Sequence, residues 1–527
     1  MRKIIVFLGI LAVSFGAFAQ GNYPVIPYPN KLVKADGLFE FKSELTITLP
    51  DALMSELEII KSIFADEYSI KVLPDSKGRL SITQNNELGA EAYKLAVSND
   101  KIEVEASTTT GVFWAVQTIR QLMKHTDGGS YTISACQIED QSAYKWRSFM
   151  LDEARYFKGE KIVKELLDQM ALLKLNIFHW HLTDDQGWRI EIKKYPLLTE
   201  IGSKRDSTQV GTWPGGWEST IFDGVPHEGF YTQVQVKEII RYAAERHITI
   251  VPEIEIPGHA SAAIAAYPWL GSLNKQIKVP GTFGVHYEVF NITDSKVETF
   301  LKDVLDEIIA LFPSPVIHIG GDEVKYDQWK NSPQVNDFMK ANNIASYADL
   351  QVWFTNKISI YIGEKGRRMM GWNEIMGTPI HDFSATDIVT KEKLAQNSIV
   401  HFWKGDLKLI NDAVTKGYDI VNSFHEYTYM DYNYTKIPLE KSYSFNPTPE
   451  NIAQSHKKQI LGFGCQMWSE WIPTRKSMQN KVFPRLAAYA EAGWTEVPNK
   501  DFDRFKQSLG ILEQYWDSKG ISYYNKE

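Results

Sequence analysis

The feature that most constrains the fold is an alternation of strand-like and helix-like segments after Lys145. Short apolar runs, rich in β-branched and aromatic residues, occupy residues 147–151, 176–182, 249–254, 316–320, 368–372, 398–403, 419–424 and 461–468. Segments with apolar residues at helical spacing lie between several of these runs, for example at 161–175, 236–247 and 297–312. Strands that alternate with helices over about 350 residues predict a (β/α)8 TIM barrel of the α/β class.

The rest of the chain divides around this barrel. Residues 20–143 combine short alternating strands, such as 93–98, with helical stretches such as 110–125, which predicts a small α+β domain. We expect the barrel to span residues 144–496 and a C-terminal helical extension to span residues 497–527.

The first 19 residues have the features of a cleavable secretory signal. Arg2 and Lys3 precede an apolar core, and Ala17-Phe18-Ala19 follows it. Because the apolar core is shorter than the roughly 20 residues needed to cross a bilayer, a membrane anchor is the weaker interpretation. We therefore expect export to a periplasm or the medium, with no membrane span in the mature protein.

Charge and cysteine content restrict the partners. A formal net charge of -8 and a pI near 5.9 argue against nucleic-acid binding, which needs a basic surface. Only Cys136 and Cys465 are present, so the fold does not depend on a disulfide framework, and whether these two pair is left open. The oligomeric state is also left open.

Polar and aromatic residues follow the predicted barrel strands, where the loops of such a barrel converge on one mouth. They are Asp152, Glu153 and Arg155; residues 179–189; Glu253, Glu255 and His259; Asp322 and Glu323; Trp372, Asn373 and Glu374; Trp403; His425, Glu426, Tyr427, Tyr429 and Asp431; and Trp468, Ser469 and Glu470. Indole rings beside carboxylates suit a pyranose, whose C–H face stacks on an aromatic ring while its hydroxyls form hydrogen bonds. This set predicts a carbohydrate site.

Several of these stretches resemble a known family. "HWHLTDDQGWR", "PEIEIPGHA", "HIGGDEV", "GWNE", "FWKG", "YTYMD" and "QMWSEW" are similar, in order and spacing, to the motifs of glycoside hydrolase family 20, the β-N-acetylhexosaminidases. The resemblance covers about Lys145 to Trp494, and the region before it resembles the small domain that often precedes the barrel in this family. It implies exo-acting, retaining hydrolysis of terminal β-linked GlcNAc or GalNAc from oligosaccharides or glycoconjugates, with no cofactor and no metal.

The resemblance also implies roles for the adjacent carboxylates. Glu323 is expected to be the general acid and then the base that activates water, while Asp322 holds the acetamide N–H and Tyr429 its oxygen. The sugar's own acetamido oxygen would attack C1 and form an oxazoline-type intermediate. Since two close carboxylates cannot both ionise cheaply, we expect one to be protonated near neutrality and act as the acid, and the other to be charged and act as the stabiliser. Gly320 and Gly321 would permit the sharp turn that brings both to the mouth.

Further roles are carried over from the resemblance. Trp372, Trp403 and Trp468 would form walls around the acetamide and the sugar ring. Arg155, Asp431 and Glu470 would bind the outer hydroxyls. Asp184 and His259 would form a relay behind the acid. Asp185 ranks below Asp184 for the relay, and Tyr427 below Tyr429.

Two alternatives from other classes stay open. His179-x-His181 at a barrel strand end has the spacing of zinc amidohydrolases, and Asp184, Asp185 and His259 could complete such a site. A non-catalytic carbohydrate-binding protein is the second alternative. The presence of both Asp322 and Glu323 argues against it.

Overall fold

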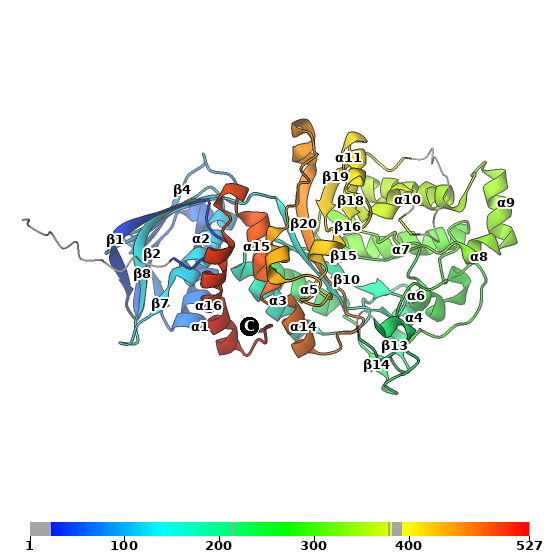
Figure 1. The fold of residues 1–527 in the computed structure, drawn as a ribbon, viewed down its shortest axis with the longest axis horizontal. Coiled ribbons are helices and arrows are strands. Elements are labelled where there is room, and N and C mark those ends of the chain that lie inside the picture. Colours follow the sequence, from blue (N-terminus) through cyan, green and yellow to red (C-terminus); the bar gives the residue numbers. More distant parts are fainter. Residues whose placement is uncertain (1–22, 213–214, 378–379, 382–392, 526–527) are drawn as a thin grey trace, which may run out of the picture.

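The computed structural model describes residues 23–212, 215–377, 380–381 and 393–525. An N-terminal sheet with its helices lies at one end of the long axis, and a closed parallel barrel occupies the other (Figure 1). This confirms the predicted fold class, a TIM barrel preceded by a smaller α+β domain. The signal predicted at residues 1–19 lies outside the described residues.

The N-terminal domain is one mixed sheet with two main helices. Its strands are β1 (Lys31–Phe41), β2 (Glu44–Thr48), β3 (Lys71–Pro74), β4 (Leu80–Gln84), β5 (Tyr93–Val97), β6 (Ile102–Ala106), β7 (Lys124–His125) and β8 (Tyr131–Asp140), in the order β1-β8-β5-β6-β4-β2-β3 with β7 beside β8. Its helices are η1 (Asp51–Glu56), α1 (Leu57–Tyr68) and α2 (Thr109–Leu122). Helix α2 is buried on almost every side, because Trp114 packs edge-on against Trp494 of the barrel while other residues of α2 face the sheet.

All of the predicted barrel strands are present. They are β9 (Trp146–Asp152), β10 (Ile177–His181), β15 (Thr249–Glu253), β16 (Val316–His318), β17 (Arg368–Trp372), β18 (Ile399–Phe402), β19 (Asp419–Asn422) and β20 (Ile460–Met467). They pair in parallel and close through contacts of β20 and β10 with β9.

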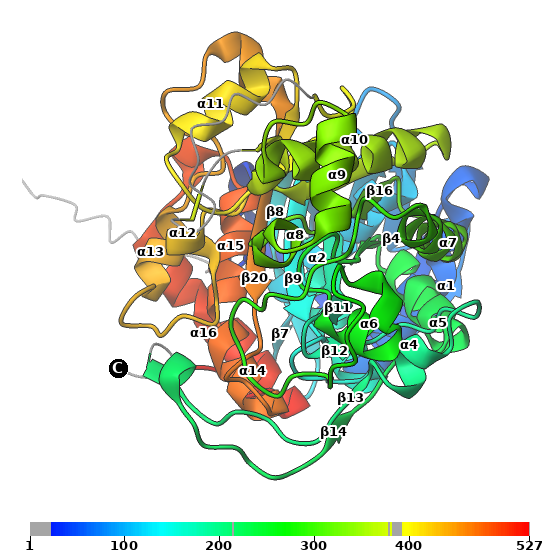
Figure 2. The ribbon, with the colours of Figure 1, turned by 90° about the vertical axis from the view of Figure 1, so that its right-hand side faces the viewer.

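Helices surround these strands, as Figure 2 shows for α5, α7, α10 and α11. The longer ones are α3 (Glu160–Leu172), α5 (Gln233–Ala244), α7 (Ser295–Leu311), α9 (Pro333–Ala341), α10 (Tyr347–Glu364), α11 (Lys408–Thr415), α14 (Arg475–Val482) and α15 (Arg485–Trp494). Short elements in the loops are β11 (Thr183–Asp184), β12 (Gly187–Trp188), α4 (Leu197–Glu200), β13 (Lys204–Arg205), η2 (Gly215–Glu218), β14 (His227–Glu228), α6 (Ser261–Ala266), η3 (Pro268–Leu270), α8 (Asp327–Lys330), η4 (Asn373–Met376), α12 (His425–Thr428), α13 (Leu439–Ser444), η5 (Gln454–Gln459) and η6 (Val497–Asn499).

The inside of the barrel changes character along its axis. An apolar layer is formed by Trp146, Ile177, Val251, Val316, Met370, Ile399 and Val421, which come from successive strands. Because side chains alternate along a strand, the residues two positions further on also point inward. These include His179, Glu253, His318 and His401, all buried. The interior therefore becomes polar toward the carboxyl ends of the strands, where a TIM barrel carries its site.

The predicted C-terminal extension is packed rather than appended. Helix α16 (Phe502–Lys519) buries Trp516, whose Nε1 donates to Gln169 of α3 at 3.0 Å. The neighbouring Tyr515 Oη lies 3.5 Å from Glu67 of α1. Helix α16 therefore contacts both the barrel and the N-terminal domain.

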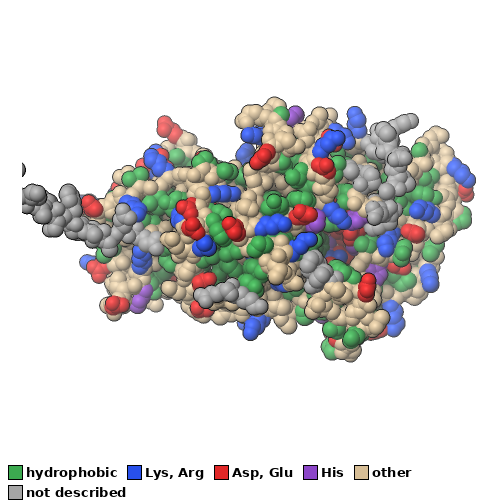
Figure 3. All heavy atoms as spheres, viewed as in Figure 1, with side chains coloured by type: hydrophobic (Ala, Val, Ile, Leu, Met, Phe, Trp, Pro, Cys, Tyr) green, Lys and Arg blue, Asp and Glu red, His purple; other side chains and the backbone are tan. Residues whose placement is uncertain are grey.

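Other sequence expectations concern the thiols, the membrane and the surface. Cys136 in β8 and Cys465 in β20 are both free and buried. Within the described ranges, no helix combines the length and apolar character needed to cross a bilayer. Acidic and basic side chains are interspersed over the face drawn in Figure 3.

Candidate active site

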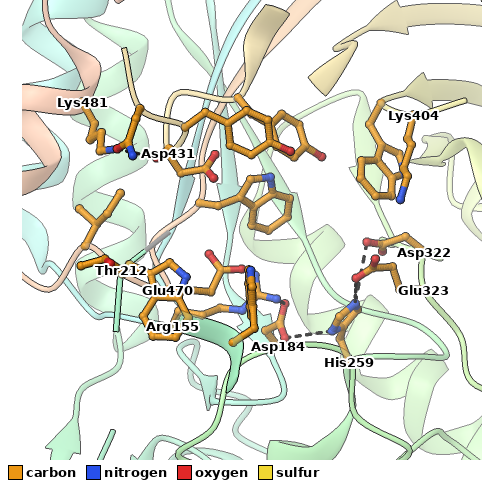
Figure 4. A pocket seen from close by; sticks show the side chains of 18 residues that line it. Arg155, Asp184, Thr212, His259, Asp322, Glu323, Lys404, Asp431, Glu470 and Lys481 are labelled. Carbon is orange, nitrogen blue, oxygen red and sulfur yellow. Dashed lines mark hydrogen bonds and ion pairs between the residues drawn. The ribbon is translucent and has the colours of Figure 1, made fainter. Parts of the chain in front are cut away.

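A pocket of about 530 Å³ opens at the carboxyl ends of the barrel strands (Figure 4). Of the residues with a preferred catalytic or binding role, Trp372 lies outside its lining and the others belong to it: Arg155, Asp184, His259, Asp322, Glu323, Trp403, Tyr429, Asp431, Trp468 and Glu470. The lower-ranked Asp185 also lies outside it. Tyr427, the weaker candidate, instead packs against Phe445 outside the described lining. The structure therefore brings together side chains that come from loops far apart in the sequence.

The chain turns sharply between β16 and the carboxylate pair. Gly320 and Gly321 have φ values of 64° and 93°, in the left-handed region that glycine enters without steric cost. A Cβ on Gly320 would lie 1.8 Å from Oε2 of the buried Glu255 side chain, so a larger residue fits there only if Glu255 moves. Glu323 itself has φ 52°, an uncommon conformation for a residue with a side chain, of the kind that clusters at active sites.

His259 links the carboxylate pair to two buried aspartates. Its Nε2 lies 3.7 Å from Glu323 Oε2 and 3.8 Å from Asp322 Oδ2, while its Nδ1 lies 3.1 Å from both Asp184 Oδ1 and Asp185 Oδ2. Burial opposes a positive charge on this ring, but Asp184 and the other carboxylates raise the pKa of His259 well above its usual value. The ring is therefore held as a cation behind the pair.

Asp184 has more partners than Asp185. It accepts from His181 Nε2 at 2.9 Å, and its Oδ2 lies 2.8 Å from a guanidinium nitrogen of Arg155. Although burial opposes ionisation, Arg155 and His259 hold the pKa of Asp184 well below its usual value. Asp185 accepts from the backbone N–H and the hydroxyl of Ser261 at 3.0 and 2.5 Å. The two aspartates share His259 but differ in their second partner.

Asp322 differs from the expectation for a permanently charged stabiliser. Burial, together with the nearby carboxylates Glu374 and Glu323, raises the pKa of Asp322 well above its usual value, although His259 opposes this. Its Oδ1 atom is buried and has no hydrogen-bond partner among the described residues. Burial therefore favours the neutral form of Asp322 in the protein without substrate. The sequence pattern could not predict this, because it does not reveal how deeply the side chain is buried.

Aromatic rings form one wall of the pocket. Trp403 stacks on Tyr429, with ring centroids 6.0 Å apart and an interplanar angle of 7°, and Trp403 Nε1 donates to Glu374 at 2.9 Å. Trp468 lies beside Tyr429. Trp372 lies outside the lining found in the described part of the chain, and packs against Trp468 with centroids 5.9 Å apart. The expected role of Trp372 as a wall around the sugar stays a prediction. From this position Trp372 would act on the sugar through Trp468.

The far end of the pocket from Glu323 is acidic. Burial and the charge of Glu470 raise the pKa of Asp431 to about 8, although Lys481 opposes this, and burial raises the pKa of Glu470 to about 6 despite the adjacent Arg155. The guanidinium of Arg155 also lies over the ring of Trp468 at 5.1 Å. Carboxyls with raised pKa values are suited to exchange hydrogen bonds with hydroxyl groups.

Sequence reasoning missed part of the lining. The additional residues are Thr212, Trp217, Lys404, Tyr432, Asn433, Trp471, Ile472 and Lys481. Trp471 belongs to the quoted "QMWSEW" stretch, and Tyr432 and Asn433 directly follow Asp431, so adjacency could have indicated them. Thr212, Trp217 and Lys481 come from a long loop and from α14, and no local pattern marks them.

The histidines and carboxylates divide into several groups that could hold a metal ion. The ligand atoms lie within 4.8 Å of one another in the groups His179–Glu253–His318, His181–Asp184–Glu255, Asp184–Asp185–His259 and His259–Asp322–Glu323. In the part of the chain that the structure describes, no group contains both His179 and His181. The zinc set that the His-x-His spacing left open as an alternative is therefore not assembled around one point among these residues.

Family models match the chain on both sides of residue 142. The catalytic domain of glycosyl hydrolase family 20 matches residues 144–497, and domain 2 of the same family matches residues 22–141.

Individual relatives agree with this assignment. A β-hexosaminidase of Porphyromonas gingivalis is 32% identical over 528 residues, which cover 95% of this chain and 64% of that protein. The structure of an exo-β-N-acetylglucosaminidase from Vibrio harveyi in complex with N-acetylglucosamine superposes with a TM-score of 0.84 at 30% identity, covering 96% of this chain and 79% of that chain. A β-N-acetylhexosaminidase structure from Bacteroides fragilis has a TM-score of 0.78 at 31% identity, and the superposition covers 95% of this chain and 96% of that chain. The chain spans about two thirds of the length of the Porphyromonas relative. It belongs to glycosyl hydrolase family 20 and carries both the catalytic domain and domain 2 of that family.

Proposed function

We propose that the protein is an exo-acting, retaining β-N-acetylhexosaminidase that removes terminal β-linked GlcNAc or GalNAc by substrate-assisted catalysis. The observation that carries this proposal is the placement of Asp322 and Glu323 at one end of an aromatic-walled pocket, in contact with His259. The N-acetylglucosamine in the similar Vibrio harveyi structure supports a 2-acetamido sugar as the ligand.

In the first step Glu323 transfers its proton to the glycosidic oxygen as the bond between that oxygen and C1 breaks. The carbonyl oxygen of the sugar's acetamide forms a bond to C1 at the same time, which gives the oxazoline-type intermediate. Asp322 releases its proton to solvent as the sugar binds, accepts a hydrogen bond from the acetamide N–H as a carboxylate, and stabilises the positive charge that develops on that nitrogen. Tyr429 donates its hydroxyl to the acetamide oxygen and orients it.

In the second step the Glu323 carboxylate removes a proton from water while the water oxygen forms a bond to C1. The bond between C1 and the acetamide oxygen breaks, so C1 is inverted twice and the β configuration is retained. An intramolecular nucleophile replaces an encounter from solution, and well-oriented groups reach effective molarities on the order of 10⁵–10⁸ M. The fixed wall of Trp403 and Tyr429 is suited to hold that orientation.

The acidic end of the pocket would bind the outer hydroxyls of the terminal sugar. Arg155, Asp431 and Glu470 lie on the far side from Glu323 (Figure 4). When the hydroxyls are bound there, C1 lies beside Glu323 and the non-reducing end of the glycan lies inside the pocket. Only a terminal sugar can bind in this way, which is the basis for exo action. We further propose that the protein is exported through the signal predicted at residues 1–19, to a periplasm or the medium.

Hydrolysis of two matched substrates tests the proposal. The protein should cleave p-nitrophenyl β-N-acetylglucosaminide and be far less active on the β-glucoside, which lacks the nucleophilic acetamide. Proton NMR of the first-formed product should show the β anomer. Equal activity on both glycosides, or a glycosyl ester trapped on any aspartate or glutamate, would refute substrate assistance. No hydrolysis of either between pH 4 and 8 would favour a carbohydrate-binding protein.

A further inference from the structure

The polar layer inside the barrel is centred on one carboxylate, Glu253. This side chain is completely buried. Its Oε2 lies 2.6 Å from His181 Nδ1 and 3.0 Å from His179 Nε2, and its Oε1 lies 2.9 Å from His318 Nδ1 and 2.8 Å from Trp372 Nε1. A carboxylate offers about four acceptor sites, so Glu253 has a nitrogen contact at each of them.

An unbroken series of contacts runs from Glu253 to the proposed acid. His181 joins Glu253 to Asp184, because its Nδ1 faces Glu253 and its Nε2 lies 2.9 Å from Asp184 Oδ2. Asp184 contacts His259 at 3.1 Å, and His259 Nε2 lies 3.7 Å from Glu323 Oε2. The series alternates carboxylate and imidazole from the barrel interior to the pocket.

The charges along this series are fixed by burial between partners of opposite sign. Burial opposes a charge on His181, but Glu253 and Asp184 together raise its pKa to about 10. The imidazoles around Glu253, that of His318 above all, hold its pKa well below the usual value against burial. His181 is thus a cation between two anions.

Other titratable groups face the two ends of this series. Glu255 lies 3.9 Å from His181, and burial beside Asp322 and Glu253 raises the pKa of Glu255 well above its usual value. Burial lowers the pKa of His318 to about 4, and His401 Nδ1 lies 3.1 Å from His318. At the other end, His381 Nε2 lies 3.3 Å from Glu323.

A second branch leads from Glu253 to the aromatic wall. Trp372 donates to Glu253, stacks on His401 with centroids 4.1 Å apart, and packs against Trp468, which lines the pocket. One buried anion therefore contacts both the relay behind the acid and the support of the sugar-facing indole.

We propose that Glu253 is a positioning residue for the hydrolytic reaction, which orients His181, and through it Asp184 and His259 behind the acid, and at the same time fixes Trp372 beneath the pocket wall. The inference rests on the proposed function, because it concerns how the acid of that reaction is supported. Buried groups that orient the residues contacting a reaction centre typically change activity about 10- to 100-fold when they are replaced.

Glu253→Gln tests this role because it keeps the volume, removes the charge, and replaces one of the two acceptor oxygens by a donor NH2 group. His181 would then keep Asp184 at 2.9 Å and the more distant Glu255 at 3.9 Å, and because burial raises the pKa of Glu255, the neutral form of His181 would be favoured. The positive charge lost at His181 lies nearer to Glu323 along the series than the negative charge lost at Glu253. Loss of a positive charge behind the acid should therefore move the basic limb of the kcat profile to higher pH.

The test compares this variant with two others in the full-length protein. His181→Gln keeps a donor at the position of Nε2 toward Asp184 but breaks the link to Glu253, and it serves if Glu253→Gln does not fold. Glu491→Gln is the matched control, since Glu491 is equally buried and contacts Arg504 and Tyr443 away from the pocket. We expect kcat to fall about 10- to 100-fold in the two relay variants with the basic limb moved to higher pH, and neither change in Glu491→Gln.

The outcomes separate this inference from the proposed function. If wild-type protein hydrolyses the acetamido substrate but Glu253→Gln and His181→Gln keep the wild-type basic limb, the positioning role is wrong and the function stands. If wild-type protein is inactive, the proposed function fails. The relay is then judged by NMR of ¹⁵N-histidine-labelled protein, in which Glu253→Gln should lower the pH at which His181 titrates. An unchanged titration would overturn it.

Discussion

His259 Nε2 lies 3.7 Å from Oε2 of Glu323, and Nδ1 of the same ring lies 3.1 Å from Asp184. One imidazole therefore contacts the proposed acid on its pocket side and a buried anion on the other. This arrangement stabilises the Glu323 carboxylate that remains after the proton has been given away, and it underlies the first predictions.

Glu323→Gln should lower kcat by about 10²–10⁴, the usual contribution of a general acid. The amide keeps the shape and cannot donate the proton or remove one from water. Steady-state hydrolysis of p-nitrophenyl β-N-acetylglucosaminide checks the prediction, and circular dichroism serves as the folding control. A folded variant within tenfold of wild type would contradict the assignment of the acid.

Asp322→Asn should lower kcat by about 10²–10³, comparable with the loss of one oriented group that stabilises developing charge. The asparagine can still orient the acetamide but cannot balance positive charge on its nitrogen. Glu470→Gln is the comparison, because Glu470 lies at the hydroxyl-binding end and its replacement should mainly raise KM. The reverse pattern, with the larger kcat effect at Glu470, would refute the division of the pocket into two ends.

Asp184→Asn and Asp185→Asn should differ, although both aspartates lie 3.1 Å from His259. Asp184 also pairs with Arg155 and His181, so its replacement should raise KM as well as lower kcat, the latter by about 10- to 100-fold. Asp185→Asn disturbs His259 and Ser261 only, and should leave KM close to that of wild type. Equal effects of both substitutions on KM would show that the Arg155 contact does not matter for binding.

Asp431→Asn should raise the thermal stability of the protein at alkaline pH. The pKa of Asp431 is raised to about 8 in the folded protein, whereas an unfolded aspartate titrates near about 4. The contribution of this group to stability is therefore complete below the unfolded pKa and is lost as pH rises through about 8. The Tm of the variant relative to wild type should increase between pH 5 and 9, and a difference that does not vary with pH would contradict the raised pKa. Activity should fall, because the variant loses a hydroxyl-binding carboxyl.

Gly320→Ala should destabilise the fold by about 2–5 kcal/mol, combining the left-handed backbone penalty with overlap in a packed site. The added methyl group would lie 1.8 Å from Glu255. Gly366→Ala is the control, because Gly366 has φ +73° and nothing within 4 Å of the added Cβ, so only the backbone penalty of about 1–2 kcal/mol applies. Urea denaturation of both variants checks the difference. Equal losses would show that Glu255 can move away.

The barrel was predictable because its strands are apolar runs that end in polar residues, a pattern which survives any loop length. The site followed for residues directly after those runs, such as Asp322 and Glu470, because a closed barrel must bring strand ends together. Trp217 and Lys481 could not be found this way, since the long loop and helix that carry them reach the pocket through tertiary folding. The raised pKa of Asp322 also escaped prediction, because desolvation depends on neighbours distant in sequence.

The position of α16 has a consequence for how the whole chain behaves under stress. This last helix contacts α1 of the N-terminal domain through Tyr515 and α3 of the barrel through Trp516, so it adds to the interface between the two domains. Cleavage of the chain just before Phe502 would remove these two contacts but no side chain that lines the pocket. Trp114 would still pack against Trp494 and Lys174 would still pair with Asp140, so the two domains would stay in contact and would lose only the part of their cooperative unfolding that α16 supplies.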